Sequence, residues 1–445
     1  MAKSNAQSNL PLIFQLIKDD NFIHLDELLK DNIDLDERNN AGQTPLIYAA
    51  NVGNSRAAKM VLNCDGIDID ARDNNGNSAF MIASEKGRIG IVKMLLERNI
   101  RIDSRNANNE TALMLAVENG KIEVSEFLIG AGAKTNARDS KNNSLLAIAV
   151  QSKNVNMLDT LLNYELDANM RNNDNETPIL LAVKNNDYNS VETLLKHKID
   201  LSAKNKNKQS VFDIAFEKEY FEILKLLLHG ADKITLGELR YDKIMQKAAI
   251  KDFYDIFEIL SKYELDIDIT EKNGITPLMK AAGNANLTTV KKLIELGADV
   301  SKKDNDGDNA LYHAFARDKD AWVMFGDFGS NRKRAEIVNI LISKGCDINN
   351  INNTGRNVLF GSAKWDRIDL LKLSIEKGLN ANIQDDSGKT PLMVAVESEN
   401  IEIISFLLGC GVDKNLVDVS GKSAMDYANK ISGKEKSKEI KKLLQ

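Results

Sequence analysis

Histidine, cysteine and paired carboxylate residues are the ones in this sequence that could ligate a metal or carry acid–base or nucleophilic chemistry. The chain has four histidines and three cysteines: His24, His197, His229, His313, Cys64, Cys346 and Cys410. No two of them share a C-x-x-C or H-E-x-x-H spacing, so the sequence predicts no metal or redox site. The acidic pair Asp385 and Asp386 lies in a segment expected to turn. We therefore expect isolated thiols, solvated or structural histidines, no metal and no cofactor.

Basic residues recur in a column at intervals of 33 or 34 positions: Arg38, Arg72, Arg105, Arg138, Arg171 and Lys204. Two interpretations are open. Aspartates close by in the sequence could neutralise the column and give a solvated, internally paired ladder; they are Asp36, Asp70 and Asp103. Alternatively, the column contacts an acidic peptide that tracks along it.

The period of this column belongs to the whole chain. Relatives of the segment TPLIYAA begin at Thr44, Ser78, Thr111, Ser144, Thr177, Ser210, Lys243, Thr276, Asn309, Asn357, Thr390 and Ser423. The intervals are 34, then seven of 33, then 48, then two of 33, and a partial relative begins at Leu10. Thirteen units therefore account for nearly all of the chain, and the long interval is one period plus a 15-residue insertion.

Each column of the repeat has a physical reason. The first position is Ser, Thr or Asn in eleven of twelve copies, and these residues cap helix N-termini. Proline follows in four copies, and Pro11 matches in the partial unit, where a fixed φ suits the first helical turn. Five residues after the cap comes alanine, or Ser362 in one copy, which lets neighbouring helices approach closely. The pattern predicts a first helix after each cap.

A second helix follows in each unit. Apolar residues spaced at i, i+3 and i+4 predict it, as in the segments beginning at Ile89, Leu287 and Ile401. It ends at Gly or Asn, as helix C-termini commonly do. A polar stretch such as residues 68–77 then leads to the next cap, and its Asn-Gly pair favours a tight hairpin.

Helix, turn, helix and hairpin finger at a period of 33, with T-P-L-x-x-A opening the first helix, closely resembles the ankyrin repeat family. The resemblance implies an all-α repeat solenoid, stacked in a curved rod, whose concave surface of first helices and finger tips holds other proteins. The family's histidine after T-P-L is missing, for example at Ile47, Met81 and Met114. Its hydrogen bond must therefore be supplied otherwise or replaced by apolar packing. The unit at Lys243 is the most divergent, and we expect a weak joint there.

The insertion falls between the two helices of the unit that begins at Asn309. Its segment, residues 316–334, carries aromatic and basic residues of the kind enriched at binding hot spots: Trp322, Phe325, Phe328, Arg332, Lys333 and Arg334. Trp365, in the following unit, occupies the position that matches the start of the insertion, so we expect the two tryptophans to be neighbours. The loop either contacts a partner or folds back to bury Trp322 on Trp365.

First-helix positions expected on the concave surface vary from unit to unit: Tyr48, Lys184, Lys247, Lys280, His313 and Lys364. Lys247, Lys280 and His313 fall in three consecutive units and form a mildly basic strip. Exposed lysine on a helix is more often a solvated face, so this is a weak signal.

Composition excludes several classes of protein. Hydrophobic residues make up 43% and charged residues 28%, which allows a buried core, and the net charge of −6 offers no broad basic field for nucleic acid. No run of about 18 apolar residues predicts a membrane span, and no signal peptide is recognisable. We expect a cytoplasmic protein, although export without a cleaved signal leaves no trace in the sequence.

These observations favour a non-catalytic scaffold that binds a protein or extended peptide, with an acidic segment as one form of partner. The alternative is a regulator that occludes a partner enzyme, and a remote one is a small-molecule receptor or an enzyme built on the solenoid. We expect a monomer without nucleic acid. The expected division is 1–43 as N-terminal cap, 44–242 as six repeats, 243–275 as the divergent unit, 276–422 as four repeats with insertion 318–332, and 423–445 as C-terminal cap.

Overall fold

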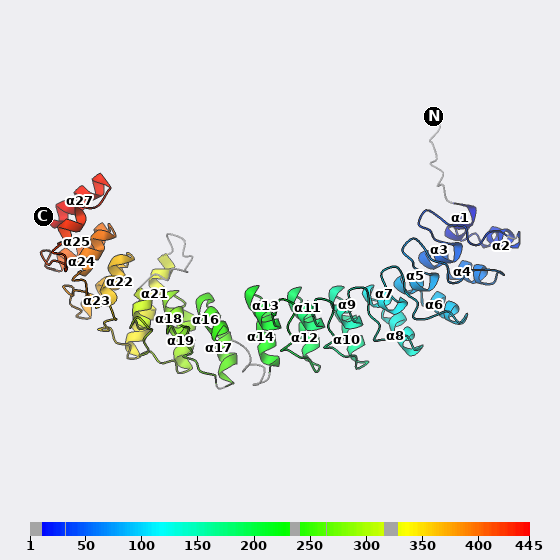
Figure 1. Cartoon of the computed structure of the whole chain (residues 1–445), viewed down its shortest axis with the longest axis horizontal. Coiled ribbons are helices and arrows are strands. Elements are labelled where there is room, and N and C mark those ends of the chain that lie inside the picture. The colour runs from blue at the N-terminus through cyan, green and yellow to red at the C-terminus, as the bar shows by residue number, and fades with distance from the viewer. Residues whose placement is uncertain (1–10, 32, 232–240, 264, 316–327) are drawn as a thin grey trace, which may run out of the picture. The chain divides into compact units, whose positions relative to one another are not determined.

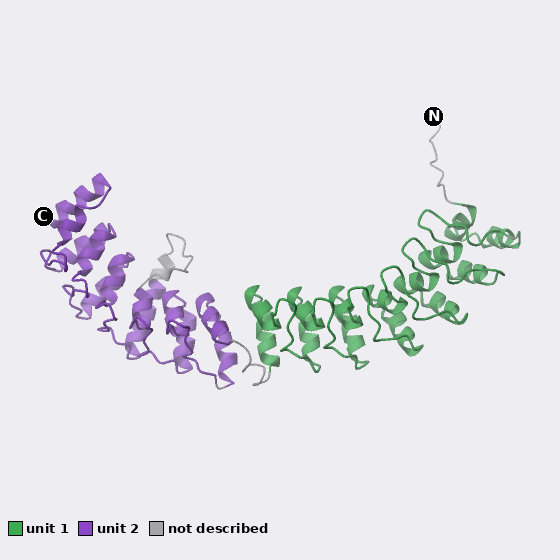
Figure 2. Cartoon of the chain, in the orientation of Figure 1, with its two compact units in different colours: residues 1–235 green, residues 236–445 purple. Residues whose placement is uncertain are grey.

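The computed structural model describes residues 11–31, 33–231, 241–263, 265–315 and 328–445, with side chains from residue 332 in the last range. The chain divides into two compact units, residues 1–235 and 236–445 (Figure 2). The division falls shortly before the divergent repeat, whose first helix starts at Tyr241. In the described residues the regular elements are helices, with two isolated β-bridges, Lys303 to Asn309 and Val417 to Ser423.

Unit 1 is a row of helix pairs. Its first helices line the concave side of the unit (Figure 1); they are α1 (Leu12–Lys18), α3 (Pro45–Val52), α5 (Ala79–Glu85), α7 (Ala112–Glu118), α9 (Leu145–Gln151), α11 (Pro178–Lys184) and α13 (Val211–Glu217). The second helices are α2 (Phe22–Lys30), α4 (Ser55–Leu62), α6 (Ile89–Leu96), α8 (Ile122–Gly130), α10 (Val155–Leu162), α12 (Tyr188–Leu195) and α14 (Phe221–Gly230). Each first helix contacts the first helices of the adjacent repeats.

Unit 2 repeats the arrangement. Its first helices are α16 (Tyr241–Lys251), α18 (Pro277–Gly283), α20 (Ala310–Phe315), α22 (Val358–Lys364), α24 (Pro391–Glu397) and α26 (Ala424–Ala428). Its second helices are α17 (Tyr254–Ser261), α19 (Leu287–Glu295), α21 (Phe328–Ser343), α23 (Ile368–Glu376), α25 (Ile401–Gly409) and α27 (Lys434–Leu444). We call the surface made by first helices and the adjoining finger residues the first-helix face of each unit.

The predicted caps are present. The hydroxyl of Ser78 accepts from the N–H of Met81 at 3.4 Å, and equivalent bonds open most first helices. Thr177 is an exception, because its buried hydroxyl has no partner among the described residues. Pro11 was predicted inside the first turn but lies one position earlier, at the N-cap of α1, where φ is −55° and ψ is 152°.

The core lies between the two helices of each repeat and between repeats. The alanine column, with Ser362 in one copy, is at most 1% exposed throughout, which confirms that close packing needs a small residue there. One position of the second helix is also fully buried from repeat to repeat, at the 33-residue spacing, for example at Leu95, Leu128 and Leu161. Ser374 takes that position in α23 and satisfies its hydroxyl by donating to the carbonyl of Leu370 at 2.8 Å.

Fingers are tight turns that stack on one another through main-chain bonds. The N–H of Asn74 donates to the carbonyl of Ala41 at 3.2 Å, and that of Ala107 donates to Asn75 at 3.2 Å. Gly76 has φ of +77°, and a Cβ there would lie 2.8 Å from the nitrogen of Ala107. Only glycine therefore allows both the left-handed turn and the approach of the next finger.

The position of the missing family histidine is filled in both of the expected ways. Apolar residues such as Ile47, Met81 and Leu180 occupy it at no more than 1% exposure. In the divergent repeat the position is Gln246, whose side-chain amide donates to the carbonyls of Ile269 and Ile275 at 3.1 and 2.8 Å. That buried amide joins the first helix to the finger that follows it.

Candidate binding surfaces

The first-helix face of unit 1 has an aliphatic floor and polar rims. Four residues after the cap, five successive repeats carry Ile82, Leu115, Ile148, Leu181 and Ile214, each 4–7% exposed. Beside this floor, a pocket of about 350 Å³ lies between the repeats of α7 and α9. Its lining includes Glu110, Glu118, Asp139 and Lys141. Burial raises the pKa of Glu118, and the neighbouring charges of Glu110, Glu85 and Asp139 add to the effect.

In the first three repeats of unit 2, cationic and polar residues replace the aliphatic floor, whereas Val394 keeps an aliphatic residue at that position in the repeat of α24. Lys247, Lys280 and His313 were predicted to form a strip. They lie on α16, α18 and α20, and α18 packs against both of the other two helices. Lys280 Nζ lies 3.9 Å from a carboxylate oxygen of Glu271. His313 Nε2 lies 2.8 Å from an Asp304 oxygen. These finger carboxylates offset part of the positive charge that the sequence alone indicates.

Asp304 is held ionised by this arrangement. Burial opposes its ionisation, but the hydrogen bonds from His313 and from the N–H of Asp308 outweigh burial and lower the pKa of Asp304. The pair joins the finger of this repeat to its own first helix. His313 is half-buried and hydrogen-bonded to Asp304, so it stabilises the repeat that carries the insertion.

The basic column of unit 1 bridges neighbouring fingers through the main chain. Arg72 donates to the carbonyl of Gly76 at 2.6 Å and to that of Arg105 at 2.8 Å. The guanidinium of Arg138 likewise donates to the main-chain carbonyls of Asn142 and Arg171, both at 2.9 Å. The four arginines from Arg38 to Arg138 thus each close their own turn and hold the carbonyl of the next arginine in the column, whereas Arg171 donates to the carbonyl of Lys204 at 3.4 Å.

Neither sequence interpretation of this column foresaw that bond. Among the described residues, the column contains one ion pair, between Arg171 and Asp200 at 3.9 Å. The aspartates expected to neutralise it, Asp36, Asp70 and Asp103, form no ion pair within that part of the chain, and Asp103 instead accepts from the N–H of Lys134 at 2.9 Å. Arg105 and Arg171 keep exposed side chains beside these bonds.

The insertion is described only at its end. Trp322 and Phe325 lie outside the described residues, and Phe328 is the first residue of α21. At 16 residues α21 is longer than any other described second helix. Arg332 and Lys333 are exposed on it. Trp365 is partly exposed after α22, with the Nζ of Lys364 at 5.0 Å from its ring centroid.

Arg334 corrects the sequence prediction. It was predicted to contact a partner, yet it is 1% exposed and donates to the carbonyl of Ala314 at 3.0 Å and to that of Gly283 at 2.8 Å. These carbonyls lie at or next to the C-terminal ends of α20 and α18, where a cation is favourable. The repeat spacing could have revealed this role, because Arg334 lies 48 residues after Asn286, whose side chain likewise bonds Ala249 and Ile250 at the end of α16.

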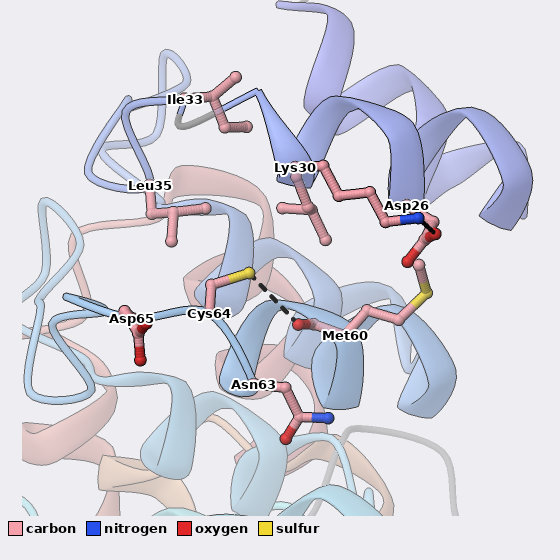
Figure 3. Close-up of a pocket in the computed structure, with 9 residues that line it drawn as sticks. Asp26, Lys30, Ile33, Leu35, Met60, Asn63, Cys64 and Asp65 are labelled. Atoms are coloured by element: carbon pink, nitrogen blue, oxygen red, sulfur yellow. Dashed lines mark hydrogen bonds and ion pairs between the residues drawn. The ribbon is translucent and has the colours of Figure 1, made fainter.

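A pocket of about 420 Å³ lies on the second-helix side of the first two repeats, where the sequence pattern predicts no site (Figure 3). Lys30 and Asp26 form an ion pair at its edge, and Met60 and Cys64 of the next repeat face them. The Cys64 thiol donates to the Met60 carbonyl at 3.5 Å. Burial, then the charges of Asp65 and Asp26, raises the pKa of Cys64, so the residue stays a thiol rather than a reactive thiolate.

The other two cysteines are also isolated. Cys346 is buried, which raises the pKa of its thiol to about 11, whereas Cys410 is exposed. Within the described residues no group of three or more His, Cys, Asp or Glu side chains could hold a metal ion. In that same part of the chain, no helix combines the length and the apolar character that crossing a bilayer requires.

Sequence reasoning missed a basic cluster in the last repeats. The residue before the cap is basic in three successive repeats, Arg356, Lys389 and Lys422, where unit 1 has Asn77, Glu110 and similar residues. Arg356 is paired with Asp385 at 2.8 Å. A comparison of this column along the chain could have found the change of charge.

The sequence matches the family model for ankyrin repeats at residues 6–106, 70–139, 99–172, 146–235, 244–323 and 329–418. No curated protein matches this chain. Two solved structures are similar over 50% of this chain and 99% of their own length. The ankyrin repeat domain of Bcl-3, described as a unique member of the IkappaB protein family, is 22% identical with a TM-score of 0.44. The human ASB11 ankyrin repeat domain is 17% identical with a TM-score of 0.45. The predicted all-α repeat solenoid is confirmed, and this chain belongs to the ankyrin repeat family.

Proposed function

We propose that this chain is a non-catalytic scaffold that binds a protein or an extended peptide along its first-helix faces, with the 318–332 insertion as a further contact. Ankyrin repeats are generally protein–protein interaction modules. Beyond this general role, we propose a specific binding surface. It includes Lys247, Lys280, His313 and Lys364 on the first helices, Trp322, Phe325, Phe328, Arg332 and Trp365 at the insertion, and the arginine column of unit 1.

One observation carries this proposal. Four residues after the cap the side chain is Leu115, Lys280 or Tyr427 in different repeats, whereas the next position is alanine or Ser362 everywhere. Packing between repeats therefore dictates the second position and leaves the first one to vary. A surface whose residues the fold does not dictate is the surface that a partner can select.

The two faces differ enough to suit different parts of a partner. Unit 1 offers a nearly buried aliphatic floor beside carboxylates, and unit 2 offers cations paired with finger acids. An extended segment lying along either face would meet side chains from several repeats in turn. Such contacts suit recognition by shape and charge better than the convergent polar groups that an enclosed ligand site needs.

Site-specific cross-linking tests the proposal. A photoreactive residue is placed at Gln151 or Lys364 on the first-helix faces, or at Lys59 or Lys438 on second-helix surfaces, all exposed positions. We expect a partner from the native cell to cross-link from the first two positions and not from the second two. Cross-links confined to Lys59 and Lys438 would contradict the proposed surface.

The same surface would also allow the alternative function, a regulator that covers the active site of a partner enzyme. Only an assay of the cross-linked partner separates the two functions. Loss of its activity on stoichiometric addition of the full chain would favour the regulator, and unchanged activity would favour the scaffold.

A further inference from the structure

A pocket of about 480 Å³ in unit 1 brings three arginine side chains together at the base of one finger. Its lining consists of Arg72, Arg101, Ile102, Asp103, Ser104 and Arg105. Asp103 is the one carboxylate in this lining, and it already accepts from the main-chain N–H of Lys134 at 2.9 Å. Three guanidinium groups against one carboxylate give the lining a net charge of +2.

Main-chain bonds hold two of these guanidinium groups in place. Arg72 donates from Nη1 to the carbonyls of Gly76 and Arg105, at 2.6 and 2.8 Å. Arg105 donates from Nη1 to the carbonyls of Asn109 and Arg138. A guanidinium has five N–H donors, so the Nη2 and Nε groups of both arginines remain available to a ligand. Within the part of the chain that the structure describes, neither arginine forms an ion pair.

Arg101 occupies a position where the turn after the second helix uses a hydrogen-bond acceptor. In nine of the eleven such turns that the structure describes, the side chain is aspartate or asparagine and accepts from the main-chain N–H two residues later, at 2.8–3.0 Å. The nine are Asp34, Asp68, Asp167, Asp200, Asp266, Asp299, Asp347, Asn380 and Asp413. Arginine and lysine side chains have no acceptor atom, so Arg101 and Lys134, at the same position of the next repeat, cannot make this bond.

Packing does not explain the arginine at position 101. Its side chain is exposed and makes no hydrogen bond or ion pair with any other described residue. The turn thus gives up a stabilising bond, and the pocket gains a third cation beside Arg72 and Arg105. Residues that break a local rule of the fold in this way are typical of functional sites.

We propose that this pocket binds the phosphorylated serine or threonine side chain of a partner peptide, with Arg72, Arg101 and Arg105 donating to the phosphate. The inference rests on the proposed scaffold function, whose surface includes the arginine column, and it names the chemistry of one partner segment. A phosphate monoester carries a charge of about −2 at neutral pH and three acceptor oxygens. It therefore matches the net charge of the lining and can accept from several guanidinium groups at once.

The surrounding charges favour a single phosphate group over a nucleic acid. The two preceding repeats carry carboxylates at the positions of Arg101 and Asp103, namely Asp34, Asp36, Asp68 and Asp70. A nucleic acid running along the fingers would bring repeated negative charge against these carboxylates. A glutamate side chain has one charge where a phosphate has two, so we expect it to bind more weakly in this pocket.

Peptide capture with the full chain tests the proposal. The probes are three immobilised libraries of nine-residue peptides that differ only at the central residue, which is phosphothreonine, threonine or glutamate. We expect retention on the phosphothreonine library to exceed retention on the other two by roughly tenfold or more, and to fall as salt rises.

Three results of this capture would overturn the proposal. Equal retention on the phosphothreonine and threonine libraries would mean that the pocket does not recognise phosphate. Retention on the glutamate library that equals or exceeds that on phosphothreonine would assign the pocket to an acidic peptide. Release of the retained chain by an equal concentration of oligothymidylate would assign it to nucleic acid.

Variants of Arg101 separate binding from folding. Arg101→Gln should lose about tenfold or more in retention on the phosphothreonine library. The matched control is Arg98→Gln, which makes the same charge change at an exposed arginine outside the lining. Equal losses in the two variants would reduce the effect to net charge and overturn the proposal.

Arg101→Asp restores the acceptor that nine other turns carry. Its thermal midpoint should therefore equal or exceed that of the natural chain, while its retention on the phosphothreonine library is lost. A lower midpoint together with lost retention would give Arg101 a structural role and contradict the role proposed for it.

A failure here is distinguishable from a failure of the scaffold function. If the phosphothreonine library does not retain the chain while a natural partner still cross-links from Gln151, this pocket is wrongly assigned and the scaffold function stands. If the natural partner cross-links from neither first-helix face, the scaffold function itself is contradicted.

Discussion

Arg105 and Arg138 lie 33 residues apart, and the guanidinium of Arg105 donates to the main-chain carbonyl of Arg138 at 2.6 Å. The bond repeats along unit 1, since Arg138 in turn donates to the carbonyl of Arg171 at 2.9 Å. Stability of such an array is a sum of local terms and nearest-neighbour terms. The arginine column therefore supplies part of the coupling between adjacent fingers, whatever else it contacts.

Replacing Arg105 by alanine should weaken that coupling. We expect a loss of about 1–2 kcal/mol in the unfolding free energy of unit 1, because a charged donor leaves two carbonyls without their partner. The measurement is urea unfolding followed by circular dichroism. Arg101→Ala, at an exposed arginine of the same finger, is the control and should change stability little. Equal losses for the two variants would mean that the bonds to the main chain contribute nothing.

Arg334 gives a second prediction about stability. Arg334→Ala removes a buried cation that bonds Gly283 and Ala314, and we expect it to cost about 3 kcal/mol. Arg332→Ala, two residues earlier and exposed, should be nearly neutral. Both tryptophans of the chain, Trp322 and Trp365, belong to unit 2, so tryptophan fluorescence during urea unfolding reports on that unit. Similar stability of the two variants would contradict the bracing role assigned to Arg334.

The repeat itself could be predicted from the sequence because its physics is local. A cap such as Ser78 and a small residue such as Ala83 act within one or two helices, and a 33-residue period makes each of them visible many times. The family, the two helices of each repeat and the finger turns followed directly from these columns.

The hydrogen-bond partners of long side chains could not be predicted in the same way. Arg72 and Arg334 both look like exposed cations in the sequence, yet each bonds one carbonyl of a neighbouring repeat. Every residue has a main-chain carbonyl, so the sequence does not indicate which carbonyl will accept a hydrogen bond. An arginine that donates to a carbonyl therefore looks unpaired in the sequence. The ammonium groups of Lys389 and Lys430 lie 4.9 and 5.4 Å from the ring centroid of Tyr427. The sequence analysis missed this group because it depends on the position of the ring as well as on the repeat spacing.

Deletion of residues 318–331 separates the two interpretations of the insertion. If it serves a partner, the deletion should leave the thermal midpoint nearly unchanged and abolish capture of the natural partner. The measurements are differential scanning calorimetry and pull-down with the full chain as reference. Severe destabilisation of unit 2 would instead favour a loop that covers Trp365. Arg334 is retained in this deletion so that its bonds to the helix ends are preserved.

Asp308 should make stability depend on pH in an unusual direction. Burial raises its pKa to about 6, against the opposing hydrogen bond from the Asn352 amide at 2.8 Å. The folded chain therefore binds this proton more tightly than the unfolded chain, and stability is lost as the pH rises from about 4 to about 6. Asp308→Asn should then be more stable than the natural chain by about 3 kcal/mol at pH 7, with the difference vanishing near pH 4.

Asp385 should make stability depend on pH in the direction opposite to Asp308. Burial opposes its ionisation, but the Ser387 hydroxyl and the Arg356 guanidinium outweigh burial and lower the pKa of Asp385. Its contribution to stability is present above the unfolded pKa and is lost as the pH falls through the folded one. Asp385→Asn should therefore destabilise the chain at pH 7, with a difference that shrinks on acidification. Urea unfolding of both variants from about pH 2 to about pH 8 covers both windows, since the Asp385 difference shrinks below about pH 4 and the Asp308 difference grows between about pH 4 and pH 6. Slopes of the same sign would contradict the assignment of either carboxylate.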